Sequence, residues 1–144
     1  MAEKFKVPVE KGKTYTIDIL RLGSNGEGVG RVENFTVFVD GALPGETVTA
    51  RITFVKKQYA TGRLEKVQKP SEHRVKPPCS VYAECGGCQL QHLSYEGQLA
   101  EKRQQVQDAV ERIGKLKDIP VLPTLGADDP WAYRNKMQLP AGGD

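Results

Sequence analysis

Between residues 14 and 67, apolar and polar side chains alternate with a period of two in five short segments. In the clearest segment, Val48, Ala50, Ile52 and Phe54 occupy alternate positions, with threonine or arginine between them. Such alternation is typical of strands with one buried face, and no helical spacing interrupts it. The sequence therefore predicts a mainly β fold built on a small five-stranded antiparallel barrel.

A glycine-rich run connects the first two predicted strands. It covers residues 23–30 and leads into an alternating segment that continues to Val39. A phosphate-binding loop would need a helix at this point, because the helix N-terminus binds the phosphate. We therefore interpret the glycines as a turn and a bent barrel strand, a pattern that favours an OB-type barrel.

Basic residues are concentrated in and after the last two predicted strands. From Arg51 to Lys76 there are eight basic and two acidic residues, a net charge of +6. A local excess of this kind suits a polyanion, and OB-type barrels bind oligonucleotides through a sheet face and its loops. The candidate RNA-binding residues of this region are Lys56, Lys57, Tyr59 and Arg63. The alternative is that the charges only solvate the barrel and that Tyr59 covers it.

All three cysteines lie within ten residues, in Cys79-Ser-Val-Tyr-Ala-Glu-Cys85-Gly-Gly-Cys88. Thiolates are suitable ligands for zinc or an iron–sulfur cluster, and the two glycines allow a tight loop around a metal. Both kinds of site normally need four ligands, and His92 is the nearest other candidate. The alternatives are a disulfide with a spare thiol, and a redox Cys-x2-Cys motif, which lacks the usual βαβ context.

The remaining segments suggest a chain of several parts. We expect a flexible lead-in (1–12), the barrel (13–68), a proline-rich linker (69–78), the cysteine loop with a helix (79–128), and the start of a truncated second domain (129–144). Ser94 is a candidate N-cap for an amphipathic helix, and Gly114 marks its end. The apolar stripe of this helix comprises Leu99, Val106, Val110 and Ile113. A further strand is expected after Trp131.

Composition limits the class of protein. The chain has 144 residues, of which 38% are hydrophobic, and no apolar run is long enough for a membrane span. The N-terminus lacks the apolar segment of a secretory signal. Together with thiols that we expect to be reduced, this predicts a cytoplasmic protein, and we expect a monomer that does not bind membranes.

The barrel, the cysteine spacing and the sequence Tyr133-Arg134-Asn135-Lys136 together resemble the bacterial 23S ribosomal RNA (uracil-5-)-methyltransferase family. The resemblance implies that the barrel is a TRAM domain and that ribosomal RNA is the partner. It implies that Cys79, Cys85 and Cys88 are three ligands of a [4Fe-4S] cluster. It also implies that Arg134, Asn135 and Lys136 belong to the opening of the family's central RNA-binding domain and contact RNA.

The chain lacks other parts of that family's pattern. The fourth cluster cysteine, the S-adenosylmethionine-binding domain, the nucleophilic cysteine and the glutamate base have no counterpart in these 144 residues. We therefore expect an N-terminal fragment that recognises RNA, holds an incomplete cluster and is inactive alone. The alternative is a self-sufficient TRAM-type RNA-binding protein with a structural metal site.

Overall fold

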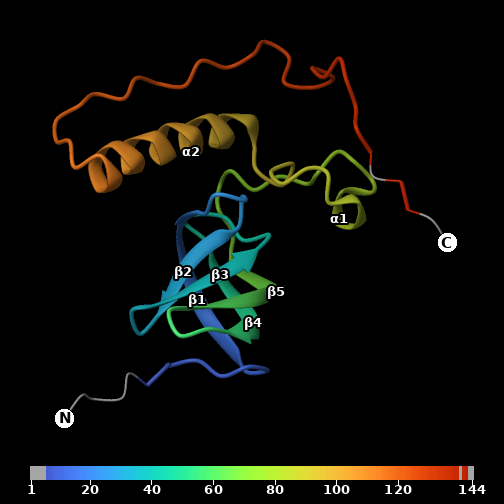
Figure 1. Ribbon diagram of the computed structural model, residues 1–144. Coiled ribbons are helices and arrows are strands. Elements are labelled where there is room, and N and C mark those ends of the chain that lie inside the picture. The colour runs from blue at the N-terminus through green and yellow to red at the C-terminus, as the bar shows by residue number, and fades with distance from the viewer. Residues whose placement is uncertain (1–5, 140, 143–144) are drawn as a thin grey trace.

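The chain folds into a closed five-stranded barrel followed by a helical segment. The computed structural model describes residues 6–139 and 141–142. The strands are β1 (Thr14–Leu22), β2 (Gly28–Val32), β3 (Phe35–Asp40), β4 (Thr47–Val55) and β5 (Tyr59–Lys69). They follow the order β1-β2-β3-β5-β4, and β4 pairs with β1 to close the barrel (Figure 1). The predicted mainly β fold is confirmed, with one difference: β3 and β5 pair in parallel, whereas the other neighbours are antiparallel.

The interior of the barrel is filled by the apolar side chains that the alternation predicts to be buried. Ile17, Val37 and Val48 have exposed fractions of 1%, 0% and 0%. The glycine run forms the β1–β2 turn and the start of β2, as expected. A Cβ at Gly30 would lie 2.4 Å from Ile17 Cγ2 and 2.6 Å from the Asp18 carbonyl oxygen, so only glycine allows β2 to approach β1 this closely.

Residues 6–12 also contribute to the barrel, although the sequence predicts a flexible lead-in here. Val9 is 3% exposed and belongs to the main core, and Val7 packs against that core. The Glu10 N–H donates to the Tyr15 hydroxyl at 2.9 Å, and the Gly12 N–H donates to the Ile52 carbonyl at 2.8 Å. This part of the segment predicted as a lead-in therefore closes one end of the core.

A bulge in β4 turns Phe54 outward. The alternation predicts that Phe54 follows Ile52 into the core, but Phe54 is 47% exposed, whereas Ile52 is 1% exposed. The pairing with β5 shifts register between these two residues: Ile52 lies opposite Gly62 and Phe54 lies opposite Thr61. Because a one-residue shift exchanges the two faces of a strand, the bulge moves the ring from the core to the outer surface.

A buried ion pair attaches the proline-rich segment to the barrel. The Glu46 side chain is 0% exposed, and its Oε1 and Oε2 accept from Arg74 Nε at 2.6 Å and Arg74 Nη2 at 2.9 Å. Arg74 Nη2 also donates to the Gly41 carbonyl at 2.6 Å. Residues 69–78, predicted as an extended linker, are thus fixed to the barrel at Arg74.

A short β-bridge then closes the base of the cysteine loop. Arg74 pairs with Leu93, the Val75 N–H donates to the His92 carbonyl at 2.9 Å, and the Ser94 N–H donates to the His73 carbonyl at 2.8 Å. Leu93 packs with Leu22 and Leu43 in a second small core between this bridge and the barrel. The loop that carries the cysteines is therefore attached to the barrel at both of its ends.

The helical segment begins and ends where the sequence predicts. The Ser94 hydroxyl accepts from the Gly97 N–H at 3.1 Å and caps α2 (Tyr95–Asp108), which continues as a π-helix, η1 (Ala109–Ile113), with Gly114 as its C-cap. Before it, α1 (Tyr82–Cys85) is a single turn in the cysteine loop. Among the described residues, no helix is long and apolar enough to cross a membrane.

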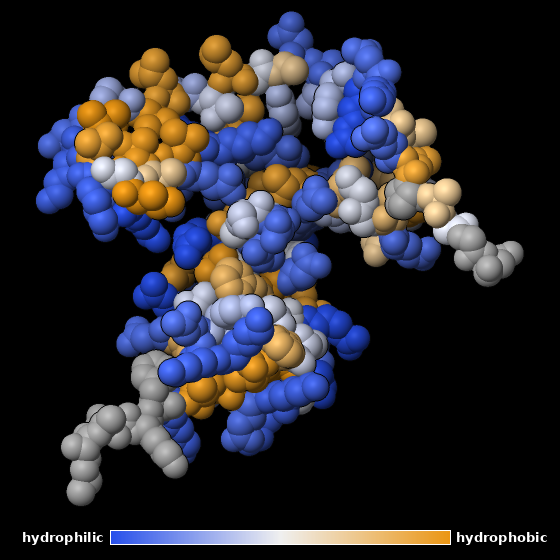
Figure 2. All heavy atoms as spheres, viewed as in Figure 1, coloured by the Kyte–Doolittle hydropathy of each residue, from blue (hydrophilic) through white to orange (hydrophobic). Residues whose placement is uncertain are grey.

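The apolar stripe predicted for the helix is not buried throughout. Gly97 packs against His73 and Leu93, but Val106 and Ile113 are 52% and 83% exposed. Figure 2 shows apolar atoms gathered at the far end of the helical segment. The chain then returns alongside α2 (Figure 1).

The strand expected after Trp131 is not formed. Residues 131–139 contain bends and irregular backbone only. A strand needs a neighbour with free backbone N–H and C=O groups. The five barrel strands pair with one another around a closed ring and present no free edge to this segment.

We predict that Arg74→Met destabilises the fold strongly. Removal of the guanidinium leaves the Glu46 carboxylate buried without its partner, which should cost about 3 kcal/mol in the free energy of unfolding, measured by urea denaturation. Burial raises the pKa of Glu46, but Arg74 and the N–H groups of Leu43 and Ser71 outweigh it and hold this pKa below its usual value. The stabilisation should therefore be present above the ordinary glutamate pKa and be lost as the pH falls through the lowered folded-state pKa.

The matched control is Arg51→Met. Arg51 also pairs with a glutamate, at 2.6 Å from Glu65, but the two side chains are 50% and 29% exposed. An exposed pair is worth at most about 1 kcal/mol, so this variant should unfold close to the parent. Equal losses in the two variants would show that Arg74 does not hold the junction.

Candidate nucleic-acid interface

An aromatic patch occupies the outer surface of three neighbouring strands. Phe38 on β3 and Phe54 on β4 both lie opposite Thr61 of β5 in the strand registers, one on each side. Tyr59 stands two residues before Thr61 and contacts Phe38 edge-to-face, with 5.5 Å between ring centroids. We call Phe38, Phe54, Tyr59 and the adjoining Lys56 the barrel patch.

Lys56 brings positive charge to these rings. Its Nζ lies 5.7 Å from the centroid of Phe54 and 5.7 Å from that of Tyr59. The side chain comes from the β4–β5 hairpin, whose first and last residues are joined by a bond of 2.8 Å from the Lys56 N–H to the Tyr59 carbonyl. Proteins that bind single-stranded nucleic acid use this combination: the bases stack on exposed rings, and a nearby cation neutralises a phosphate.

The other barrel residues predicted from sequence lie close to this patch but outside it. Lys57 is exposed at the tip of the same hairpin, and Arg63 is exposed on β5, opposite Arg51 on one side and Asp40 on the other. Two cations of the basic excess are engaged elsewhere, because Arg74 pairs with Glu46 and Arg51 with Glu65. The remaining lysines and Arg63 make no ion pair among the described residues.

The cysteine loop presents all three thiols to solvent. Cys79, Cys85 and Cys88 are free and exposed. Its shape is fixed by two bonds across the loop: the Cys79 N–H donates to Gln91 Oε1 at 3.2 Å, and the Tyr82 hydroxyl donates to the Gln89 carbonyl at 2.9 Å.

The three thiols are suitable metal ligands, but the structure does not group them around one point. Three thiols are suitable ligands for an iron–sulfur cluster or zinc. However, within residues 6–139 and 141–142, no three His, Cys, Asp or Glu side chains are grouped so that they could hold a metal ion. As placed, the cysteines therefore do not form a ready-made metal site.

His92, the alternative fourth ligand, is buried behind the loop with an exposed fraction of 4%. Its Nδ1 lies 2.8 Å from the Tyr82 hydroxyl, whose only proton is donated to Gln89. Nδ1 must therefore carry the imidazole proton, and Nε2 has a lone pair with no hydrogen-bond partner among the described atoms. Burial, followed by the charge of Arg74, lowers the pKa of His92 and so favours the neutral form of the ring.

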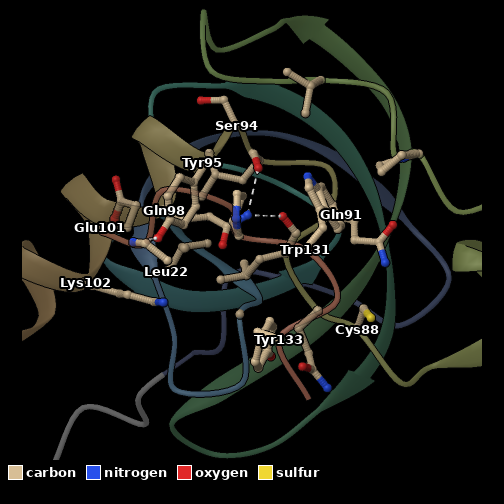
Figure 3. A pocket seen from close by; sticks show the side chains of 18 of the residues that line it. Leu22, Cys88, Gln91, Ser94, Tyr95, Gln98, Glu101, Lys102, Trp131 and Tyr133 are labelled. Atoms are coloured by element: carbon tan, nitrogen blue, oxygen red, sulfur yellow. Dashed lines mark hydrogen bonds between the residues drawn. The ribbon is translucent and has the colours of Figure 1, made fainter. Parts of the chain in front are cut away.

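A groove separates the barrel from α2 and the returning chain. It has a volume of about 1400 Å³, and its walls come from the β1–β2 turn, the cysteine loop, α2 and residues 127–134 (Figure 3). Arg134 lines it, with its guanidinium carbon 5.9 Å from the Tyr133 ring centroid. Asn135 and Lys136 are exposed just beyond. Of the predicted RNA-binding residues, Lys56 and Tyr59 thus belong to the barrel patch and Arg134 lines the groove. Lys57, Arg63, Asn135 and Lys136 are exposed outside both.

Sequence reasoning missed Phe54 as a surface residue. Its position in the alternating pattern assigns it to the core, and the bulge that exposes it leaves no mark in that pattern. The aromatic character of positions 38, 54 and 59 is visible in the sequence, but their meeting depends on the β3-β5-β4 strand order.

The barrel matches a known domain family, and most of the chain is similar to known proteins. Residues 8–64 match the TRAM domain family. The chain is 50% identical over 139 residues to an uncharacterized RNA methyltransferase of Clostridium tetani. The match covers 96% of this chain and 30% of that protein. It is 53% identical over 133 residues to an uncharacterized RNA methyltransferase of Halalkalibacterium halodurans, and the match covers 91% of this chain and 29% of that protein. It is 48% identical over 134 residues to one of Listeria innocua, with coverage of 93% and 29%.

The chain thus spans about 30% of the length of these relatives. A solved structure also matches: the solution structure of the conserved protein from the gene locus MMP0076 of Methanococcus maripaludis. It is 36% identical and has a TM-score of 0.41, and the match covers 42% of this chain and 87% of that one.

Proposed function

Because residues 8–64 form a TRAM domain in a chain that is homologous to proteins named RNA methyltransferases, we propose that the barrel binds RNA through the barrel patch. The observation that supports this most directly is the meeting of three partly exposed rings with Lys56 on one outer face. Bases stack on such rings, and each stacked base is worth roughly 1–3 kcal/mol. Lys57 and Arg63 border the patch and would contact phosphates.

We propose that the barrel and the cysteine loop serve a protein that methylates C5 of uracil in 23S ribosomal RNA, with S-adenosylmethionine as the methyl donor. Support comes from the cysteine spacing, the Tyr133-Arg134-Asn135-Lys136 motif and the homology to RNA methyltransferases. In this proposal the residues of this chain bind and orient RNA, and none of them forms a bond to the base.

We predict that the salt dependence of RNA binding comes from the cations around the patch. Each lysine or arginine that neutralises a phosphate releases counterions, with a slope contribution of about 0.7 per contact for a single strand. Replacement of Lys56, Lys57 and Arg63 by Ala should flatten the plot of log affinity against log salt by up to about 2. Fluorescence anisotropy of a labelled single-stranded RNA measures this.

The matched control replaces three cations outside the barrel, Arg112, Lys115 and Lys117, by Ala. All three are exposed, and none contacts the barrel patch or lines the groove. This variant should keep most of the parent slope. Phe54→Ala should lower the affinity at every salt concentration without changing the slope, because stacking releases no counterions. An unchanged slope in the triple barrel variant would mean that RNA does not bind at this patch.

We also predict that the chain competes with a homologous enzyme for its RNA. The 144-residue chain, added in excess, should slow the transfer of labelled methyl groups to 23S ribosomal RNA by the Clostridium tetani relative, and it should transfer none itself. The Lys56, Lys57 and Arg63 variant should compete less. If the relative does not methylate uracil C5 in this RNA, the proposed reaction is wrong.

For the cysteines, we propose that Cys79, Cys85 and Cys88 are ligands of a [4Fe-4S] cluster once the loop rearranges. Support comes from the thiol donor set and the exposure of all three thiols. Anaerobic reconstitution of the chain, followed by iron and sulfide analysis, should yield a cluster that air destroys quickly, because three thiolates leave one iron open. A stable tetrahedral zinc site that includes His92 would contradict this.

A further inference from the structure

We propose that the groove between the barrel and α2 is a second site for single-stranded RNA, in which bases stack on Trp131. This extends the proposed RNA binding of the barrel patch to a separate surface, and it rests on that proposal for the class of ligand.

The wall that carries Trp131 is anchored to the helix. The Ala127 N–H donates to the Tyr95 hydroxyl at 2.7 Å, the Thr124 hydroxyl donates to the Leu99 carbonyl at 2.9 Å, and Arg103 Nε donates to the Val121 carbonyl at 2.8 Å. Gly126 permits this contact, since a Cβ there would lie 2.9 Å from Leu99 Cδ1. The returning chain is therefore held at a fixed place along α2.

The opposite wall is the junction between the barrel and the cysteine loop. Gly26 in the β1–β2 turn packs so closely on the loop that a Cβ there would lie 3.2 Å from Gln89 Cβ and 3.3 Å from Leu90 Cδ2. Gln98 Nε2 on α2 donates to the carbonyls of Leu90 at 3.1 Å and Leu93 at 3.0 Å, which joins the helix to the segment that follows Cys88. Both walls are thus held by contacts that do not involve a ligand.

Two exposed aromatic rings border this hollow. Trp131 and Tyr133 are 52% and 70% exposed, and the backbone N–H of Trp131 donates to Asp129 Oδ1 at 2.9 Å. Figure 3 shows both residues around the same hollow as Tyr95 and Lys102 of the helix. Exposed rings of this kind offer stacking faces to unpaired bases.

The charge of the lining suits a polyanion. Its charged residues are Lys76, Lys102 and Arg134 against one carboxylate, Glu101. Burial, followed by the charge of Asp108, raises the pKa of Glu101. A volume of about 1400 Å³ also exceeds the roughly 300–1,000 Å³ of small-molecule pockets and can admit several nucleotides.

Trp131 makes the test direct, because it is the single tryptophan of the chain and its fluorescence reports the groove alone. The titration uses an oligouridylate of about 12 nucleotides, within the range of single-strand binding sites. The protein used is the variant in which Lys56, Lys57 and Arg63 are replaced by Ala, which weakens binding at the barrel patch. Anisotropy measures that loss separately. We expect RNA to quench Trp131 in this background.

The charge variant is Lys102→Ala with Arg134→Ala, and the matched control is Arg112→Ala with Lys117→Ala, two exposed cations outside the groove. The RNA concentration at half-quenching should rise at least about fivefold in the first and stay within about twofold in the second. For Trp131→Ala, anisotropy should show binding at least about fivefold weaker, and Trp131→Phe should restore most of it.

Absence of quenching, or quenching that the Lys102 and Arg134 replacements leave unchanged, would overturn the proposal. The barrel proposal stands or fails independently, because it is read from the salt slope of barrel variants, which do not alter the groove.

Discussion

The arrangement of the whole chain depends on one buried ion pair. The Glu46 carboxylate, 0% exposed, accepts two bonds from Arg74 and two from backbone N–H groups. Burial of a carboxylate is costly unless such partners compensate it. This pair determines where the chain leaves the barrel, and with it the bridge from Arg74 to Leu93, the base of the cysteine loop and the start of α2. The groove exists because these elements are fixed next to the β1–β2 turn.

The barrel could be predicted because its information is local. Alternation identifies the five strands, glycine identifies the β1–β2 turn, and Ser94 and Gly114 mark the limits of the helical segment. Each of these signals acts over a few residues. Glu46 and Arg74 are 28 residues apart in sequence, and nothing near either residue indicates the other. The attachment of the predicted linker to the barrel therefore could not be anticipated.

The candidate site was predictable in its chemistry but not in its geometry. Composition and motif identify cations, rings and thiols, because these residue types carry the relevant interactions wherever they lie. Their grouping depends on strand order and register: Tyr59 meets Phe38 through a parallel pairing, and Arg134 lies in a groove away from Lys56. The strand expected after Trp131 did not form, because apolar and aromatic residues favour a strand only where a partner strand is available.

The bulge in β4 has a consequence for how this chain is compared with its relatives. Whether an aromatic residue at position 54 faces outward depends on one extra residue between two paired positions, not on the identity of the side chain. A homologue that keeps the phenylalanine but loses one residue of this strand would bury the ring and lose it from the outer surface. A homologue with a different sequence but the same irregularity would keep an outward position there. An outward aromatic ring at this position therefore requires both the bulge in β4 and an aromatic residue.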